Sequence, residues 1–177
     1  NAIATLPVLD PNSGDFLSTP INAKEDKQSI NLTLDHQLNK HVTLSASYSH
    51  MKDKWKSKDG WTLGPESGWD SDDINTGINH LRPQNHYALN VSYENARFYT
   101  GLLLNYYTGC SGLAFTDNRF LILDWNANYE FANGITAYVT VGNLTNESYE
   151  TSYNSWNGLG SSAMPGRYFM VGTKYKF

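Results

Sequence analysis

The sequence predicts an all-β fold, and this prediction rests on its composition, on side chains that alternate with period two and on the lengths of its links. The 177 residues include 12 Tyr, 7 Phe, 5 Trp and 14 Gly, a mixture that suits pleated strands and polar turns. Only 40% of the residues are hydrophobic, and the apolar clusters are as short as Leu102-Leu103-Leu104. A transmembrane helix needs about 20 consecutive apolar residues, so a helical membrane protein is excluded.

Alternation of side-chain character marks about seven strands. In one of them Val42, Leu44, Ala46 and Tyr48 alternate with Thr and Ser. The predicted strands cover residues 30–35, 42–49, 87–93, 98–106, 121–130, 135–141 and 168–177. Because successive side chains of a strand point to opposite faces, each strand should have one apolar face and one polar face.

The links between these strands alternate between short and long. Residues 37–41, residues 94–96 and the pair Asn133-Gly134 make tight connections, and an Asn-Gly pair is a favoured hairpin turn. The long polar links cover residues 54–84, 108–118 and 147–166. A transmembrane antiparallel β-barrel has short periplasmic turns and long extracellular loops, so its C-terminus would lie in the periplasm. Residues 1–27 would then belong to one more outer loop, and residues 28–177 would be barrel strands with these three extracellular loops.

The lengths of the predicted strands agree with the thickness of a bilayer. Phe98 and Tyr106 would lie about 27 Å apart along one face, or about 20 Å apart along the membrane normal at a tilt near 40°. A soluble β-protein such as a lipocalin-like barrel is the alternative, but the polar face of residues 121–130 is long and carries Asp124 and Glu130. The residues that we expect to face lipid are Leu32, Leu44, Leu89, Leu102, Leu123, Val139 and Val171. The residues that we expect to face the lumen are Ser47, Asn90, Asn126 and Thr140.

Charge and cysteine content exclude other classes. The formal net charge is -4 and the Lys and Arg residues are scattered, so no nucleic-acid surface is expected. The single cysteine, Cys110, is expected to be a small loop residue, and a bridge to a segment outside this chain is the alternative. The chain begins at Asn1 without Met or an apolar leader, so any export signal is expected upstream or already removed. No Ser, His and Asp have a recognisable catalytic spacing, so we expect no enzyme.

Two stretches near the C-terminus resemble the TonB-dependent outer-membrane receptors. Residues 141–150, Val-Gly-Asn-Leu-Thr-Asn-Glu-Ser-Tyr-Glu, are similar to the penultimate-strand motif of that family. Residues 165–177, which begin with Pro-Gly-Arg and end with Phe177, are similar to its final strand. Many outer-membrane proteins end in an aromatic residue, whereas the Asn-Leu and Pro-Gly-Arg elements favour this family. The resemblance covers the chain from about residue 28 onward.

The resemblance implies a 22-stranded barrel filled by an N-terminal plug domain, of which this chain would supply the C-terminal strands. An odd number of strands does not close a bacterial barrel, so the chain is expected to be a fragment or to pair with other chains. The plug is absent from it, and the plug would connect the receptor to the TonB-ExbB-ExbD energy-coupling complex. The resemblance also implies that the barrel-assembly machinery reads the final strand through Phe169, Tyr175 and Phe177.

The same resemblance implies uptake of a scarce nutrient, caught by aromatic and polar side chains of the outer loops. A ferric siderophore, which is a small-molecule metal chelate, is the commonest cargo, and haem, cobalamin and glycans are the alternatives. The candidate ligand-binding residues are the aromatic residues Trp55, Trp61, Trp69, Tyr107, Tyr153 and Trp156. Aromatic residues of loops also pack against neighbouring loops or lie at the membrane interface, which is the alternative for each of them.

Two weaker candidates concern metal ions. Asp70, Asp72 and Asp73 could bind Ca²⁺ through carboxylate oxygens, but a solvated acidic loop is the favoured explanation because their spacing matches no known calcium loop. A haem ligand among the dispersed histidines is the other candidate, and these are His36, His41, His50, His80 and His86. No resident cofactor is therefore expected. A diffusion porin, an outer-membrane enzyme and an adhesin barrel stay open as alternatives to a gated importer.

Overall fold

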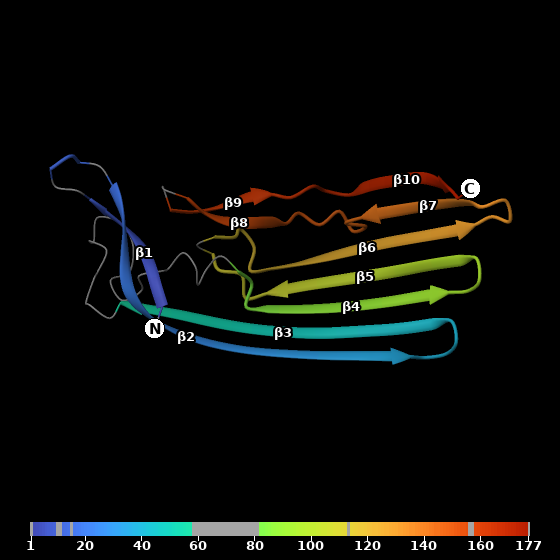
Figure 1. The fold of residues 1–177 in the computed structure, drawn as a ribbon, viewed down its shortest axis with the longest axis horizontal. Coiled ribbons are helices and arrows are strands. Elements are labelled where there is room, and N and C mark those ends of the chain that lie inside the picture. Colours follow the sequence, from blue (N-terminus) through green and yellow to red (C-terminus); the bar gives the residue numbers. More distant parts are fainter. Residues whose placement is uncertain are drawn as a thin grey trace.

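The computed structural model describes residues 2–9, 12–14, 16–57, 82–112, 114–155 and 158–176, and the side chains of residues 12–14, 26–52, 82–112, 114–153 and 160–176. These residues form an all-β structure (Figure 1). Its strands are β1 (Ala2–Leu9), β2 (Phe16–Gln37), β3 (Val42–Ser57), β4 (Asn85–Glu94), β5 (Phe98–Thr108), β6 (Arg119–Glu130), β7 (Ile135–Gly142), β8 (Glu150–Ser155), β9 (Gly158–Ala163) and β10 (Tyr168–Tyr175). Within the described ranges no helix has the length and apolarity to cross a membrane.

The main sheet has eight strands in the order β1-β2-β3-β4-β5-β6-β7-β10, and all neighbours are antiparallel. Strands β8 and β9 form a separate hairpin within the link between β7 and β10. The seven strands expected from alternation correspond to β2 to β7 and β10, so this part of the prediction is confirmed.

Three segments expected to be links contain strands. Strand β2 begins at Phe16 and β1 precedes it, so residues 1–27 hold most of a hairpin, and the position of this segment outside the cell stays a prediction. Strand β3 continues to Ser57, past the expected start of the link at residue 54. The link of residues 147–166 contains β8 and β9. Charged residues interrupt the alternation of residues 24–27 and 52–56, but the backbone ladder continues through them because it does not depend on side-chain polarity.

Three short turns lie at one end of the main sheet, together with the C-terminus, as Figure 1 shows. An Asn side chain stabilises each turn. The Oδ1 atom of Asn39 accepts hydrogen bonds from the amides of His41 and Val42 (2.9 and 3.1 Å), and Asn95 and Asn133 accept equivalent bonds in the next two turns. We call this end of the sheet the turn end and the opposite end the loop end.

Strand register separates the side chains into two faces. Cross-strand partners share a face, and one row runs through Leu34, Ala46, Leu89, Leu104 and Leu123. All seven residues expected to face lipid lie on this face, which we call the apolar face, and all four residues expected to face the lumen lie on the other, the polar face. The apolar side chains are not gathered in an interior core, since Leu32 is 61% exposed and Val171 is 77% exposed.

Aromatic side chains border the apolar face at two levels. Near the loop end, Tyr48 stacks on Tyr87 with ring centroids 4.8 Å apart, and Tyr106 follows at 6.1 Å. Near the turn end, Tyr93 and Phe98 lie 6.2 Å apart, and Phe98 is the cross-strand partner of Tyr129. Between these levels the rows hold mainly Leu, Val and Ala with one Trp. On β4 the two aromatic levels are about 20 Å apart at 3.3 Å per residue.

The described residues contain one buried hydrophobic cluster, made of Cys110, Ala114, Phe115 and Phe120. Tyr107, Ile122 and Tyr149 pack against it. The cluster lies on the polar face at the loop end, because Tyr107, Phe120 and Ile122 are polar-face positions of β5 and β6.

Candidate ligand-binding site

A row of aromatic rings crosses the polar face at the loop end. His86 of β4 stacks on Tyr107 of β5 with ring centroids 4.3 Å apart and an interplanar angle of 4°. Tyr107 in turn stacks on Phe120 of β6 at 4.7 Å, and Phe120 stacks on Tyr149 of the following link at 5.7 Å. We call these four residues the aromatic ladder. Because the stacked rings cover one another's faces, the aromatic ladder presents mainly ring edges to a ligand, and ring edges pack favourably against the face of another aromatic group.

The connection between β5 and β6 folds over one end of the aromatic ladder. Gly109 allows this reversal with a φ of 71°, a left-handed conformation that side chains other than Asn and Asp rarely adopt. The amide of Cys110 then donates to the carbonyl of Asn118 (3.1 Å), which closes the loop. Phe115 reaches Phe120 with centroids 6.5 Å apart. The apolar residues of this loop therefore pack against Phe120, at the start of β6.

Cys110 is buried in this cluster at 6% exposure and makes no disulfide within the described part of the chain. Burial raises the pKa of its thiol, which keeps it neutral near pH 7. The side chain therefore packs here as a small apolar residue, and a bridge to a segment outside this chain stays an alternative.

A carboxylate of β8 holds the same loop in place. Both oxygens of Glu150 accept hydrogen bonds from Thr116, one from its amide (2.9 Å) and one from its hydroxyl (2.8 Å). The amide bond of Thr116 is the largest cause that lowers the pKa of Glu150, and the hydroxyl bond adds to it. The position of loop 109–118 over the aromatic ladder is thus coupled to the hairpin of β8 and β9.

The charges around the aromatic ladder are sparse. Nε2 of His86 lies 2.9 Å from Oδ1 of Asn105, which orients the ring that stacks on Tyr107. Asp124 is the one acid among the polar-face positions of β4 to β7 at the loop end, and it accepts a hydrogen bond from the amide of Asn143 (2.8 Å). Those same described positions hold no Lys or Arg. The site therefore offers aromatic edges and neutral polar groups more than positive charge.

The two stretches that resemble a receptor family meet at one junction. Asn143 follows β7, is 2% exposed, and pairs twice with Glu147: its Nδ2 donates to the Glu147 carbonyl and its Oδ1 accepts from the Glu147 amide, both at 2.8 Å. Its Nδ2 also lies 3.4 Å from the carbonyl of Pro165. Asn146 accepts a hydrogen bond from the amide of Arg167 (2.9 Å), next to the start of β10. These contacts fasten the end of β7 to the beginning of β10.

The junction also needs a backbone conformation that Asn tolerates. Asn143 and Asn146 have φ values of 50° and 56°, in the left-handed region where Asn is enriched. The sequence motif therefore has a structural role at this junction, and a ligand contact is not needed to explain its residues.

The structure places only some of the predicted ligand-binding residues. Tyr107 is a central member of the aromatic ladder. Tyr153 is 47% exposed on β8 and packs across the hairpin onto Gly160, away from the ladder rings. Trp55 pairs with Glu25 through the backbone, but its side chain lies outside the described residues. The remaining candidates also lie outside them: Trp61, Trp69, Trp156 and the acidic residues Asp70, Asp72 and Asp73.

Sequence reasoning missed His86, Phe120 and Tyr149 as the other members of the aromatic ladder. A signal for two of them was present, because counting back from the tight turn at residues 95–97 pairs His86 with Tyr107, and counting across loop 109–118 pairs Tyr107 with Phe120. Of the other histidines, His41 and His50 bond elsewhere, and His80 lies outside the described residues. His41 and His50 bond to the Glu94 carbonyl and to Asn85, and the described residues contain no group of three His, Cys, Asp or Glu side chains suited to a metal ion.

The predicted assembly residues can be placed in part. Phe169 and Tyr175 lie on the apolar face of β10 and are 69% and 57% exposed, while Phe177 lies outside the described residues. Their recognition by an assembly machinery stays a prediction.

Comparison with known proteins finds the fold in solved structures. Neither a family model nor a curated protein matches the sequence. A structure of the FpvAI-pyocin S2 complex matches 92% of this chain with a TM-score of 0.63 and 16% identity. A structure of P. aeruginosa FpvA bound to a heterologous pyoverdine-iron complex matches 100% of this chain with a TM-score of 0.65 and 15% identity. The chain spans 20% and 23% of the lengths of those two chains.

These likenesses agree with the resemblance noted at the C-terminal motifs. The chain has the all-β fold of one part of the TonB-dependent receptor FpvA, and the similarity covers nearly the whole of this chain.

Proposed function

We propose that this chain is the C-terminal part of the barrel wall of a TonB-dependent outer-membrane receptor. The observation that carries the proposal is the banding of the apolar face, where aliphatic rows lie between two aromatic levels about 20 Å apart. A transmembrane barrel presents such an apolar band, about 25 Å tall with aromatic girdles, to lipid. The high exposure of Leu32 and Val171 supports this, because these side chains need an apolar environment that the chain itself does not supply.

The proposed orientation follows from the two ends of the sheet. The turn end, with its three Asn-stabilised turns and the C-terminus, lies in the periplasm, and the loop end lies outside the cell. In this placement the aromatic ladder faces the lumen at the extracellular mouth, where an incoming ligand arrives.

We further propose that the ladder contributes to the binding of a ferric siderophore. The edges of the stacked His86 and Tyr107 rings can pack against the face of a planar group, and Asn105 offers an amide beside them. The low positive charge near the ladder supports a ligand whose contacting part is neutral. The FpvA structure bound to a pyoverdine-iron complex shows that a receptor with this fold takes a ligand of the siderophore class.

Transport would require the parts of a receptor that lie beyond this chain. A plug domain would fill the barrel and contact the TonB-ExbB-ExbD complex, and the barrel-assembly machinery would insert the protein into the outer membrane. Porins, barrel enzymes and adhesins share the banded wall, so dependence on TonB is the property that separates a gated importer from them.

The test uses the complete protein that contains this chain. A strain that lacks it is grown on single ferric siderophores, and uptake of radioactive iron is measured with and without TonB. We expect one siderophore to depend on both the receptor and TonB. Equal uptake without TonB would contradict a gated importer.

A matched pair of variants tests the ladder. Tyr107→Ala removes the central ring, whereas Tyr99→Ala removes a ring from the same face of β5 near the turn end. Loss of an aromatic contact of about 1 kcal/mol or more should weaken ligand binding about fivefold or more in the first variant only. Equal ligand binding by both variants would mean that the aromatic ladder does not contact the ligand.

A further inference from the structure

The carboxylate of Asp124 lies on the polar face between the aromatic ladder and the β7–β10 junction. The pairing of β6 with β7 ends at Trp125 and Val141, so Gly142 is the next residue of β7 beside Asp124. Tyr168 of β10 is in turn the cross-strand partner of Gly142. Asp124, Gly142 and Tyr168 therefore form one row across three neighbouring strands.

Two tyrosine side chains approach this carboxylate from different segments. A Cβ atom at position 142 would overlap the ring and hydroxyl of Tyr168, so this ring covers Gly142, the neighbour of Asp124. Tyr149 comes from the link and is the last ring of the aromatic ladder. Burial raises the pKa of Tyr149, and the charge of Asp124 and the Tyr168 hydroxyl raise it further, which shows that the three groups lie close together. We call Asp124, Tyr149 and Tyr168 the acid–tyrosine cluster.

The backbone uses only one oxygen of the Asp124 carboxylate. Oδ1 accepts the hydrogen bond from the amide of Asn143 (2.8 Å), and no residue of the described ranges donates to Oδ2. The Asp124 side chain is partly buried and keeps some contact with solvent. One charged oxygen is therefore available to a ligand.

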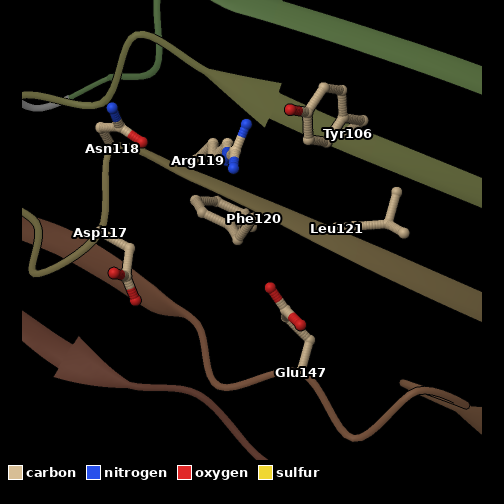
Figure 2. Close-up of a pocket in the computed structure, with 7 residues that line it drawn as sticks. All are labelled: Tyr106, Asp117, Asn118, Arg119, Phe120, Leu121 and Glu147. Atoms are coloured by element: carbon tan, nitrogen blue, oxygen red, sulfur yellow. The ribbon is translucent and has the colours of Figure 1, made fainter.

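The cations of the neighbouring strands do not neutralise this charge. Lys174 is on the polar face of β10, but it lies in the half of that strand at the turn end. Arg119 is at an apolar-face position of β6 and borders an open pocket together with the carboxylates of Asp117 and Glu147, as Figure 2 shows. Among the described residues Asp124 thus has no Lys or Arg partner.

The acid–tyrosine cluster has the chemistry of a site for an organic cation. An ammonium group donates hydrogen bonds to a carboxylate and to phenol oxygens, and its charge is attracted to aromatic rings within about 6 Å. Tyr168 is 49% exposed, so its ring is accessible from the polar face. An anionic group would be repelled by Asp124 and would meet no Lys or Arg in the cluster. The charge of the cluster therefore selects a cation.

We propose that the acid–tyrosine cluster binds a primary ammonium group, and that the siderophore bound at the aromatic ladder carries this group. The ammonium donates to Oδ2 of Asp124 and lies against the Tyr168 ring, while an adjoining part of the ligand contacts the ladder through Tyr149. The identity of the occupant rests on the proposed function, whereas the preference of the cluster for a cation does not.

The test measures the binding of benzylamine and benzyl alcohol to the complete receptor in detergent, using saturation-transfer NMR near pH 7. The two probes share a ring and differ in charge, because benzylamine is protonated at this pH. We expect benzylamine to bind about fivefold more tightly, the upper end for a partly exposed ion pair. The preference should fall as the salt concentration is raised.

Matched variants assign the preference to the cluster. Asp124→Asn removes the charge but keeps an Oδ1 acceptor for the amide of Asn143, so it should fold and should bind the two probes alike. Asp35→Asn is the control, because it neutralises an exposed acid of the polar face near the turn end and should keep the preference. Tyr168→Leu removes a ring and should reduce the preference.

Each outcome decides the proposal. A preference that survives in Asp124→Asn would overturn it, and so would equal binding of both probes, or binding of neither, by the unchanged receptor. The uptake test on single ferric siderophores decides the occupant, since dependence confined to siderophores without an amino group would contradict it. TonB-independent uptake together with an intact amine preference would reject the gated importer and keep the cation site, so the two failures are distinguishable.

Discussion

Asn143 offers the most direct test of how the β7–β10 junction is held together. Asn143→Ala removes both side-chain hydrogen bonds to Glu147, at about 1 kcal/mol each, and also the longer, 3.4 Å bond to the Pro165 carbonyl. It also places a residue without a polar side chain at a φ of 50°, which costs about 1 to 2 kcal/mol more. The junction should therefore lose about 3 to 4 kcal/mol. Asn143→Gly removes the same bonds but adopts this φ freely, so it should lose only about 2 kcal/mol.

The assay is amide hydrogen exchange in the folded full-length protein. The amides of Leu144, Asn146 and Arg167 report on the junction without bonding to the Asn143 side chain. Their exchange should rise by about 100-fold or more in the Ala variant and by about 30-fold in the Gly variant, if exchange follows local opening. Asn126→Ala, at an exposed polar-face position of β6, should leave these amides unchanged.

Two results would refute this reasoning. Equal exchange in the Ala and Gly variants would mean that the left-handed backbone carries no cost at this position. Unchanged exchange in both would mean that packing, and not the buried amide side chain, holds the junction.

Three further predictions concern the loop, the C-terminus and the topology. The pKa of Glu150 is lower in the folded protein than in the unfolded chain, where it is about 4.5. The hydrogen bond from the Thr116 amide to Glu150 should therefore persist above this unfolded value and weaken as pH falls through the folded pKa. Faster exchange of the Thr116 amide at low pH would reveal this weakening. Glu150→Gln should abolish that pH dependence, and an unchanged profile would contradict the Glu150 contact. Deletion of Phe177 from the complete receptor should sharply reduce the amount in the outer membrane while inserted molecules bind ligand normally, because one rim aromatic stabilises a finished barrel by only about 1 to 3 kcal/mol; normal surface levels with defective binding would argue for a role in the folded receptor. A peptide tag placed within residues 54–84 should be labelled by antibody on intact cells, and labelling only after the periplasm is opened would invert the proposed orientation.

Much of the sheet could be predicted from local sequence because its signals are local. Alternation with period two assigns each side chain to a face, and tight turns then set the register of neighbouring strands. The partition of Leu89 and Leu102 from Asn90 and Asn126 is therefore already present in the sequence, and the structure confirms it. The extension of β2 and β3 was missed because charged residues such as Lys24 and Lys56 interrupt the alternating pattern. The pairing of these two strands continues there because it depends on backbone hydrogen bonds alone.

The candidate sites depend on contacts that local patterns do not encode. Tyr107 is one aromatic residue among 24 Tyr, Phe and Trp, and no local pattern indicates that it stacks between His86 and Phe120. Likewise, Glu150 and Thr116 are 34 residues apart, and they meet because the link after β7 returns to the side of β6.

The amino-acid sequence by itself determined the fold class, the two faces of each strand and the alternation of turns with links, because these follow from spacing along one strand or across one turn. Only the tertiary structure decided which aromatic rings stack in the aromatic ladder and that Asn143 and Asn146 fasten the two C-terminal motifs together. The physical reason is the same in each case: long links fold back on the sheet and bring together groups that are far apart in the sequence. Local sequence preferences do not determine the geometry of such contacts.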